Sequence, residues 1–112
     1  MRKNLITGVF KKSFIYVIEK KKIAHLNDFY DLLGGFKRFY KSEKSFKGAI
    51  RATLQSFSKD CNSFGGNDLF ASLDKNGFWM RASDRHIQGL YKQLKDSGLG
   101  KYKSVKICME YL

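Results

Sequence analysis

Residues 42–59 of this chain read SEKSFKGAIRATLQSFSK, and this stretch decides the fold that we expect. Its apolar side chains recur at steps of three and four residues, which places them on one face of a helix. These apolar residues are Phe46, Ala49, Ile50, Thr53, Leu54 and Phe57. A second stripe with the same spacing lies opposite and consists of Lys44, Lys47, Arg51, Gln55 and Lys59. The stretch therefore predicts an amphipathic helix that packs with one face and presents basic and amide side chains with the other.

The five side chains of the second stripe are candidates for DNA contact, because recognition helices in the major groove have this layout. Lys44 and Lys47, near the N-terminal end, are expected to meet phosphates, which the helix dipole also favours. Arg51 is expected to contact guanine, and Gln55 to contact adenine. Gly48 on the same face lowers helix stability, which a close approach of the backbone to DNA would explain. The plainer alternative is a solvated charged face, which many surface helices have.

The composition favours a folded domain that has an anionic partner. The chain has 112 residues, of which 43% are hydrophobic and 15% aromatic, enough for a core without disulfides. The formal net charge is +12, and nucleic acid is the commonest large anion. Residues 36–59 hold seven basic residues and one acid, Glu43, so part of the excess is local. A membrane surface or an acidic protein would also balance the charge.

The cysteines and the apolar runs bear on the location of the chain. Cys61 and Cys108 lie far apart and predict no framework of disulfides, so we expect a reduced cytosolic chain. Since DNA is the expected partner, we expect this chain to be a nucleoid-associated protein of a bacterial or phage-like source. No apolar run approaches the ~20 residues that a helix needs to span a bilayer, so we expect no membrane segment.

Two further helices are expected before residues 42–59. Periodic apolar residues predict a helix over residues 5–22 and another over residues 26–33, with Asn27 as the cap of the second. A very short strand at residues 23–24 would separate them. Gly34-Gly35 would end the second helix, because glycine readily takes the left-handed conformation found at helix ends.

The linker over residues 36–42, FKRFYKS, alternates aromatic and basic side chains. We expect its aromatic rings to join the core while Lys37 and Arg38 contact backbone phosphates. Stacking of these rings on unpaired nucleotides is a less favoured alternative.

After the third helix, alternating side chains predict strands over residues 69–73 and 78–82. Asn76-Gly77 between them is a strong signal for a hairpin. Lys75 and Asn76 at its tip are expected to reach the minor groove or a phosphate. The order of helix, short strand, helix, helix and hairpin is that of a winged helix-turn-helix, an α+β fold with three helices and a β-hairpin wing.

The run AIRATLQSFSKD, a Gly-Gly turn, the letters NDLF and a Gly-aromatic-Trp strand together resemble winged-helix modules found beside restriction endonuclease domains. They are also similar to the broader HARE-HTH group of winged helices. The likeness covers about residues 46–81, at Ile50, Arg51, Ala52, Thr53, Leu54, Asp68, Leu69, Phe70, Gly77 and Trp79. The resemblance implies DNA binding in a restriction or modification context. Transcription regulation is the other context in which we expect a DNA-binding protein of this kind. It implies no catalysis, because the nuclease part of such proteins lies outside the module.

Residues 83–112 are expected to form a C-terminal helical extension packed on the winged-helix domain of residues 1–82. Apolar spacing predicts a helix over residues 83–95, capped by Ser83 and ended by Gly98. The spacing in residues 101–112 fits a strand and a helix equally well, and we favour a helix. Its apolar side chains would pack on the first helix, on a homodimer mate or on a partner protein.

No set of residues predicts an active site, so we expect neither enzymatic activity nor a cofactor or metal. His25, His86, Cys61 and Cys108 lack the close spacing of zinc-binding loops. The carboxylates do not cluster as a two-metal nuclease requires. Two rivals to DNA binding stay open. One is an interaction module that binds a nuclease or polymerase partner, and the other is a nucleic-acid enzyme that uses His86.

Overall fold

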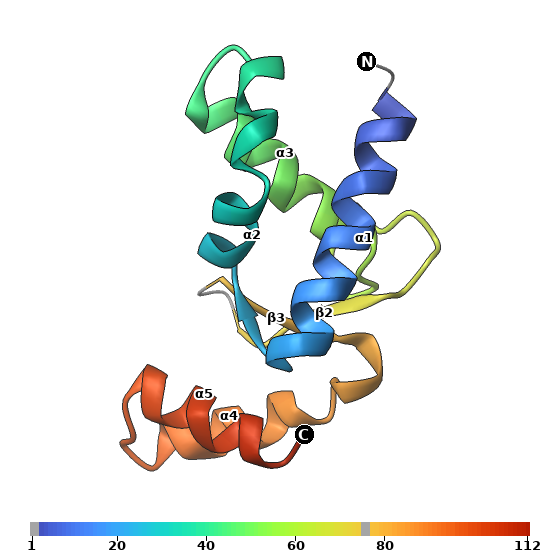
Figure 1. The fold of residues 1–112 in the computed structure, drawn as a ribbon. Helices are drawn as coiled ribbons and strands as arrows, with labels where there is room; N and C mark the ends of the chain where they lie inside the picture. The colour runs from blue at the N-terminus through green and yellow to red at the C-terminus, as the bar shows by residue number, and fades with distance from the viewer. Residues whose placement is uncertain (1–2, 75–76) are drawn as a thin grey trace.

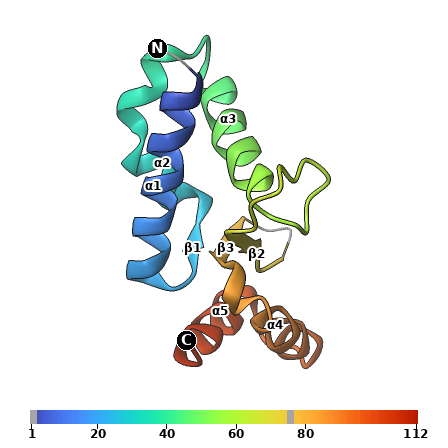
Figure 2. The same ribbon diagram turned by 90° about the vertical axis from the view of Figure 1, so that its right-hand side faces the viewer.

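The structure is a computed structural model that describes residues 3–74 and 77–112. It is an α+β fold in which helices lie on both sides of a small antiparallel sheet (Figures 1 and 2). In chain order the elements are α1 (Lys3–Lys21), β1 (Ala24–His25), α2 (Leu26–Leu32), the 3-10 helix η1 (Gly34–Phe39), α3 (Glu43–Ser56), β2 (Phe70–Ser72), β3 (Phe78–Arg81), the 3-10 helix η2 (Ala82–Asp84), α4 (Ile87–Asp96) and α5 (Lys101–Glu110).

The sheet has the strand order β1-β3-β2, and both pairings are antiparallel. Ala24 pairs with Trp79, and Ala71 pairs with Met80. The predicted hairpin is confirmed as β2 and β3, which are shorter than expected. The two-residue strand β1, which lies between α1 and α2 in the chain, pairs with β3 and becomes the third strand of the sheet. The sheet is therefore completed by a pairing between segments that are distant in sequence.

Side chains on β3 alternate between two cores, because successive residues of a strand point to opposite faces. Trp79 joins the core formed with α1, α2 and α3, whereas Phe78 and Met80 join the core formed with α4 and α5. On β2, Phe70 and Ala71 divide in the same way. The sheet therefore separates two layers of helices.

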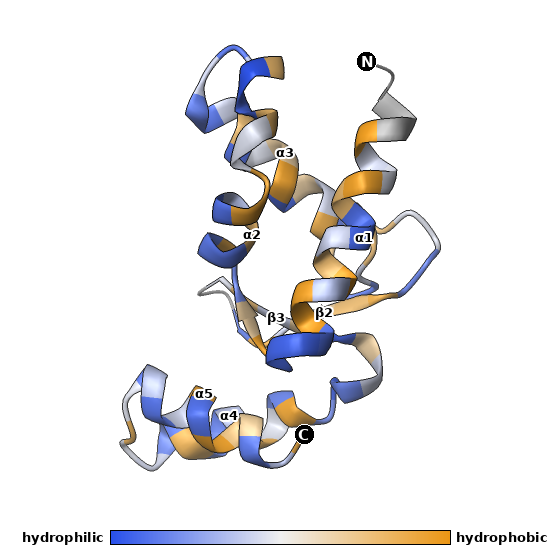
Figure 3. Ribbon diagram, viewed as in Figure 1, coloured by the Kyte–Doolittle hydropathy of each residue, from blue (hydrophilic) through white to orange (hydrophobic). Residues whose placement is uncertain are grey.

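The first core is rich in aromatic rings contributed by distant segments. The Phe14 ring of α1 is fully buried and makes edge contacts with two other rings, at 4.9 Å to Phe29 and 5.9 Å to Phe70 between centroids. From α3, Phe46, Ile50 and Leu54 are all buried in this core. The apolar stripe predicted for α3 is thus its packed face, and hydrophilic residues lie between its hydrophobic ones (Figure 3).

The second core holds α4 and α5 against the other face of the sheet. Ile87 and Tyr91 of α4 and Val105 and Cys108 of α5 are buried there around Met80. The predicted helix in the tail is confirmed as α5. The boundary at residue 82 between the winged-helix domain and its C-terminal extension stays a prediction. None of the described helices combines the length and apolar character needed to cross a membrane.

The ends of α2 differ from the prediction. Its N-cap is His25 rather than Asn27, since the His25 Nδ1 atom accepts a hydrogen bond from the Asn27 amide at 3.0 Å. Asp28 completes the cap by accepting from the His25 amide at 3.0 Å. Gly34 and Gly35 do not end the helix in a left-handed conformation, because Leu33 is its C-cap and both glycines begin η1.

Three further expectations are wrong in detail. Ser83 does not cap α4, because it lies inside η2 and α4 begins only at Ile87. The Phe39 ring of the expected linker is 45% exposed rather than packed, although Phe36 and Tyr40 are partly buried. The third helix ends at Ser56 instead of near residue 59. Gly98 follows α4 with φ +95°, as the prediction of a glycine stop requires.

Candidate nucleic-acid interface

The outer face of α3 is available to a partner along its length. Ser42 caps the helix, because its Oγ atom accepts a hydrogen bond from the Ser45 amide at 3.1 Å. Lys44, Arg51 and Gln55 are exposed on the side opposite the buried residues. The predicted polar stripe is therefore confirmed as a surface for these three residues.

Two basic side chains of α3 are held by Tyr30, a residue of α2 with a largely buried ring. The Arg51 Nη1 atom donates a hydrogen bond to the Tyr30 hydroxyl at 3.2 Å. The Lys47 Nζ atom lies 5.2 Å from the centroid of the same ring, within range of a cation–π interaction. These contacts restrict Lys47 and Arg51, so each would lose less side-chain freedom on binding.

One acidic side chain lies among these bases. The Glu43 carboxylate is 3.3 Å from the Lys37 Nζ atom and 3.6 Å from the Lys47 Nζ atom. The hydrogen bond from Lys37, together with the charge of Lys47, lowers the pKa of Glu43. Glu43 thus stays ionised and cancels part of the positive charge at the N-terminal end of α3.

The 3-10 helix η1 adds bases beside this end of α3. Lys37 and Arg38 are both exposed, and the ion pair between Lys37 and Glu43 places η1 next to the first turn of α3. The Arg38 guanidinium carbon lies 5.0 Å from the centroid of the exposed Phe39 ring. The structure therefore brings the predicted phosphate contacts of η1 and α3 into one region.

The remaining predicted contacts are not part of this region. Lys59 is exposed, but it follows the end of α3 and does not continue the helical stripe. Its amide donates to Asp68 at 2.9 Å, which fixes its backbone in the turn after the helix. Lys75 and Asn76 lie outside the described residues.

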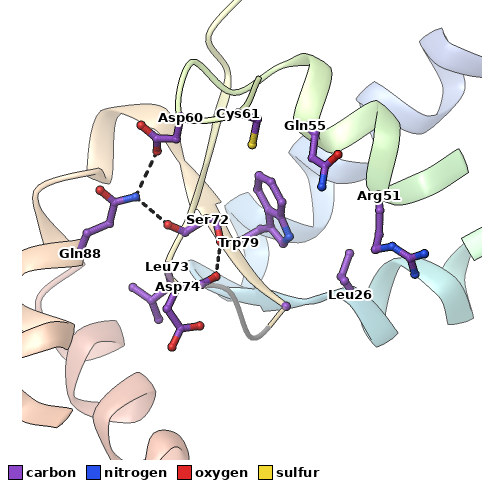
Figure 4. A pocket seen from close by; sticks show the side chains of 11 residues that line it. Leu26, Arg51, Gln55, Asp60, Cys61, Ser72, Leu73, Asp74, Trp79 and Gln88 are labelled. Carbon is purple, nitrogen blue, oxygen red and sulfur yellow. Dashed lines mark hydrogen bonds between the residues drawn. The ribbon is translucent and has the colours of Figure 1, made fainter. Parts of the chain in front are cut away.

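A pocket of about 450 Å³ lies between the C-terminal half of α3 and the β2–β3 hairpin. Figure 4 shows the Trp79 ring within it, between Gln55 and Leu26, while Arg51 lies at one side. Its lining also includes Asp60, Cys61, Ser72, Leu73, Asp74, Gly77 and Gln88. This site could not be predicted from the sequence, because its residues come from segments that share no spacing.

Hydrogen bonds fix the wall of the pocket opposite Arg51. The Gln88 Nε2 atom of α4 donates to the Asp60 carboxylate at 3.2 Å and to the Ser72 carbonyl at 2.7 Å (Figure 4). Arg85 donates to the same Asp60 carboxylate at 3.0 Å, and to Asp68 through two nitrogen atoms. Gln88 of α4 and Arg85, which precedes α4, therefore hold the turn that follows α3 in place.

The other candidate residues do not form a site. Among residues 3–74 and 77–112, no group of three His, Cys, Asp or Glu side chains could hold a metal ion. His86 is exposed ahead of α4, and Asp84 accepts a hydrogen bond from Arg81 at 3.2 Å. Cys61 and Cys108 are both free thiols, and burial raises the pKa of Cys108.

No protein-family model, curated protein or solved structure matches this chain.

Proposed function

We propose that this chain is a winged-helix protein that binds double-stranded DNA with α3 in the major groove. The β2–β3 hairpin then lies against the backbone or the minor groove. The element order and the strand order β1-β3-β2 support the winged-helix assignment. The observation that carries the proposal is the exposed stripe of Lys44, Arg51 and Gln55 on a helix whose apolar face is packed in the core. Phe46, Ile50 and Leu54 on that face are fully buried.

Contacts to phosphates would come from the N-terminal end of α3 and from η1. Lys44 is exposed in the first turn of α3, where the helix dipole favours an anion. Lys37 and Arg38 lie beside this turn, so they would contact the same strand of the duplex. Such contacts fix the position of the protein on DNA without reading its sequence.

Contacts to base edges would come from the middle of α3. Arg51 is held by Tyr30 through one nitrogen, which leaves its other donors for the paired acceptors of guanine. Gln55 can donate to and accept from adenine. Gly48 lies between them and Lys44, and a Cβ atom there would meet only Arg51, at 3.9 Å. Internal packing therefore does not require this glycine, whereas a close approach of DNA would.

Binding to a random-sequence duplex, followed by fluorescence anisotropy over a range of salt concentrations, tests the proposal. We expect the logarithm of the affinity to fall linearly with the logarithm of salt, with a slope near −0.9 per phosphate contacted. Arg51→Ala should weaken binding to a selected site by about 1–3 kcal/mol. Lys92→Ala, an exposed lysine on α4, is the matched control. Equal affinity and unchanged sequence preference in Arg51→Ala would disprove the role of α3.

The resemblance of residues 46–81 extends the proposal to restriction-modification or transcription regulation, with cytoplasmic or nucleoid DNA as the partner. Cleavage of DNA by the protein alone, lost in His86→Ala, would favour the enzyme alternative instead.

A protein-interaction module is the second candidate, and two exposed rings favour it. Tyr102 and Tyr111, at the C-terminal end of the chain, are 73% and 69% exposed, and aromatic residues are enriched in interfaces. They lie with α5 on the far side of the sheet from α3 (Figure 2). A partner protein or a homodimer mate that binds there should be retained at high salt and lost in the double substitution of both tyrosines by Ala.

A further inference from the structure

We infer that the pocket between α3 and the hairpin binds a single unpaired nucleobase, supplied either by DNA or by a free nucleotide. For a base supplied by DNA, the inference rests on the proposed function. Both sources offer the same chemistry, which is a planar heterocycle with a hydrogen-bonding edge.

The pocket combines an apolar wall with an aromatic ring, as a base requires. Leu26, Leu73 and Trp79 supply apolar surface from α2, the hairpin and β3. Trp79 is only 5% exposed and belongs to the first core, which fixes its ring, and it also lines the pocket (Figure 4). The volume of about 450 Å³ is within the range of roughly 300–1,000 Å³ for small-ligand sites.

Polar atoms without a partner converge on the same space. The side-chain amide group of Gln55 and the Trp79 Nε1 atom make no hydrogen bond to any described residue. Gln55 can both donate and accept, whereas the indole nitrogen only donates. Arg51 adds further donors, because Tyr30 occupies one of its nitrogens. The edge of a base offers acceptors and donors side by side, which such a set can match.

The lining, rather than the volume, distinguishes this pocket from other hollows of the protein. A groove of about 420 Å³ beside α1 has hydroxyls as its polar side-chain groups, and its lining contains neither a side-chain amide nor a guanidinium. It is lined by Ile6, Thr7, Phe10, Phe39, Tyr40, Ala49, Ala52 and Thr53. Another, of about 440 Å³ beside α5, contains Tyr102 but no tryptophan. In the pocket beside α3, the aromatic ring, the amide and the guanidinium occur together.

The wall opposite Arg51 is formed before any ligand arrives. Gln88 joins Asp60 to the Ser72 carbonyl, and Arg85 holds Asp60 from a second direction. A preformed site loses less conformational entropy on binding. The pocket also adjoins the proposed DNA surface, because Arg51 and Gln55 belong to both. A base that leaves the stack beside α3 would therefore meet the pocket directly.

The chain contains a single tryptophan, Trp79, and it lines this pocket, so a ligand that binds there should change the intrinsic tryptophan fluorescence of the folded protein. The probes are a fully paired duplex, the same duplex with one unpaired base, and free deoxynucleoside monophosphates. We expect the unpaired base to raise the affinity about tenfold over the paired duplex and to quench the fluorescence. Saturable quenching of the fluorescence by a free nucleotide would support the inference that the pocket binds a base, with the free nucleotide as its source.

Two substitutions test the location of the base. Gln55→Ala should remove the preference for the unpaired base, so that the ratio of the two affinities falls to about one. Cys61→Phe fills the pocket from the turn after α3 and should have the same effect on that ratio, with circular dichroism as the check on folding. Gln93→Ala, an exposed glutamine on α4, is the matched control and should keep the full ratio.

The outcomes separate this inference from the proposed function. Salt-dependent binding of the paired duplex, without any preference for the unpaired base and without quenching by nucleotides, would overturn the pocket and leave DNA binding intact. Quenching by nucleotides without any binding of duplex would overturn DNA binding and support the pocket. A preference for the unpaired base that both substitutions leave unchanged would place that base elsewhere and also overturn the inference.

Discussion

Arg85 donates hydrogen bonds to both carboxylate oxygens of Asp68, with its Nη1 atom 2.9 Å from one and its Nη2 atom 2.8 Å from the other. Such a paired arrangement is stronger and more directional than a single contact. It joins the start of α4 to the segment that leads into β2, and so it links the two helical layers at the edge of the sheet.

Removal of this contact should destabilise the fold. In Arg85→Ala, Asp68 and Asp60 each lose a charged partner, and we expect the free energy of unfolding to fall by about 1–2 kcal/mol. Arg85→Lys should recover only part of the loss, because an ammonium group cannot pair with both oxygens in this way. Urea denaturation measures both variants, and an Arg85→Ala variant as stable as the parent would contradict the prediction.

The same contact should make stability depend on pH at the acidic end. The hydrogen bonds from Arg85 lower the pKa of Asp68 from 3.8 to about 2 in the folded protein. Because the folded pKa is the lower one, the carboxylate stabilises the fold fully above about pH 4, and this contribution is lost as pH falls toward 2. Urea midpoints measured across this range should fall less steeply in Asp68→Asn, whereas Asp96→Asn, at the exposed end of α4, should follow the parent curve.

Lys22 occupies a backbone conformation that favours glycine. It follows α1 with φ 71°, and its amide donates to the Ile18 carbonyl at 2.7 Å. A residue other than glycine in the left-handed conformation lowers the stability of the fold by about 1–2 kcal/mol. Replacement by glycine removes this strain, but part of the gain is lost because glycine increases the conformational entropy of the unfolded chain. We expect Lys22→Gly to raise the free energy of unfolding by about 0.5 kcal/mol. Lys20→Gly, inside the last turn of α1, should lower it by roughly 0.5–1 kcal/mol instead.

The two cores should unfold together if the sheet couples them. Phe14→Ala empties part of the first core and should cost about 3–5 kcal/mol, whereas Met80→Ala empties part of the second and should cost about 2–5 kcal/mol. Because Trp79 and Met80 are neighbours on β3 but belong to different cores, either change should shift one common transition. Far-ultraviolet dichroism and Trp79 fluorescence would follow it. Separate transitions in Met80→Ala would instead support a division at residue 82.

In the proposed mode of DNA binding, Glu43 should weaken the affinity of the parent protein for DNA. It lies between Lys37 and Lys47, so phosphates would have to approach its negative charge. Glu43→Gln removes that charge and frees both lysines, and we expect DNA to bind a few-fold more tightly at low salt. Anisotropy at several salt concentrations measures the gain. Glu110→Gln, an exposed acid at the end of α5, controls for the change in net charge, and an equal gain there would contradict a local effect.

Local signals predicted α3 well and the start of α2 poorly. The apolar stripe of α3 is a property of neighbouring residues, so its spacing alone identified the face that packs. The start of α2 depends on a distant strand, because pairing of His25 with Phe78 keeps the His25 backbone extended. The helix can begin only after this residue, and His25 rather than Asn27 becomes its cap.

The sequence by itself determined the α+β class, the order of the elements and the buried face of α3, because periodic side chains and turn residues act within a few positions of each other. Only the tertiary structure decided which polar groups meet. Arg51, Trp79 and Gln88 line one pocket although they belong to α3, β3 and α4. Arg85 likewise meets Asp68 and Asp60, although 17 and 25 residues separate it from them along the chain. Contacts between such segments produce no regular spacing of residues in the sequence, because they depend on how the two cores pack against the sheet.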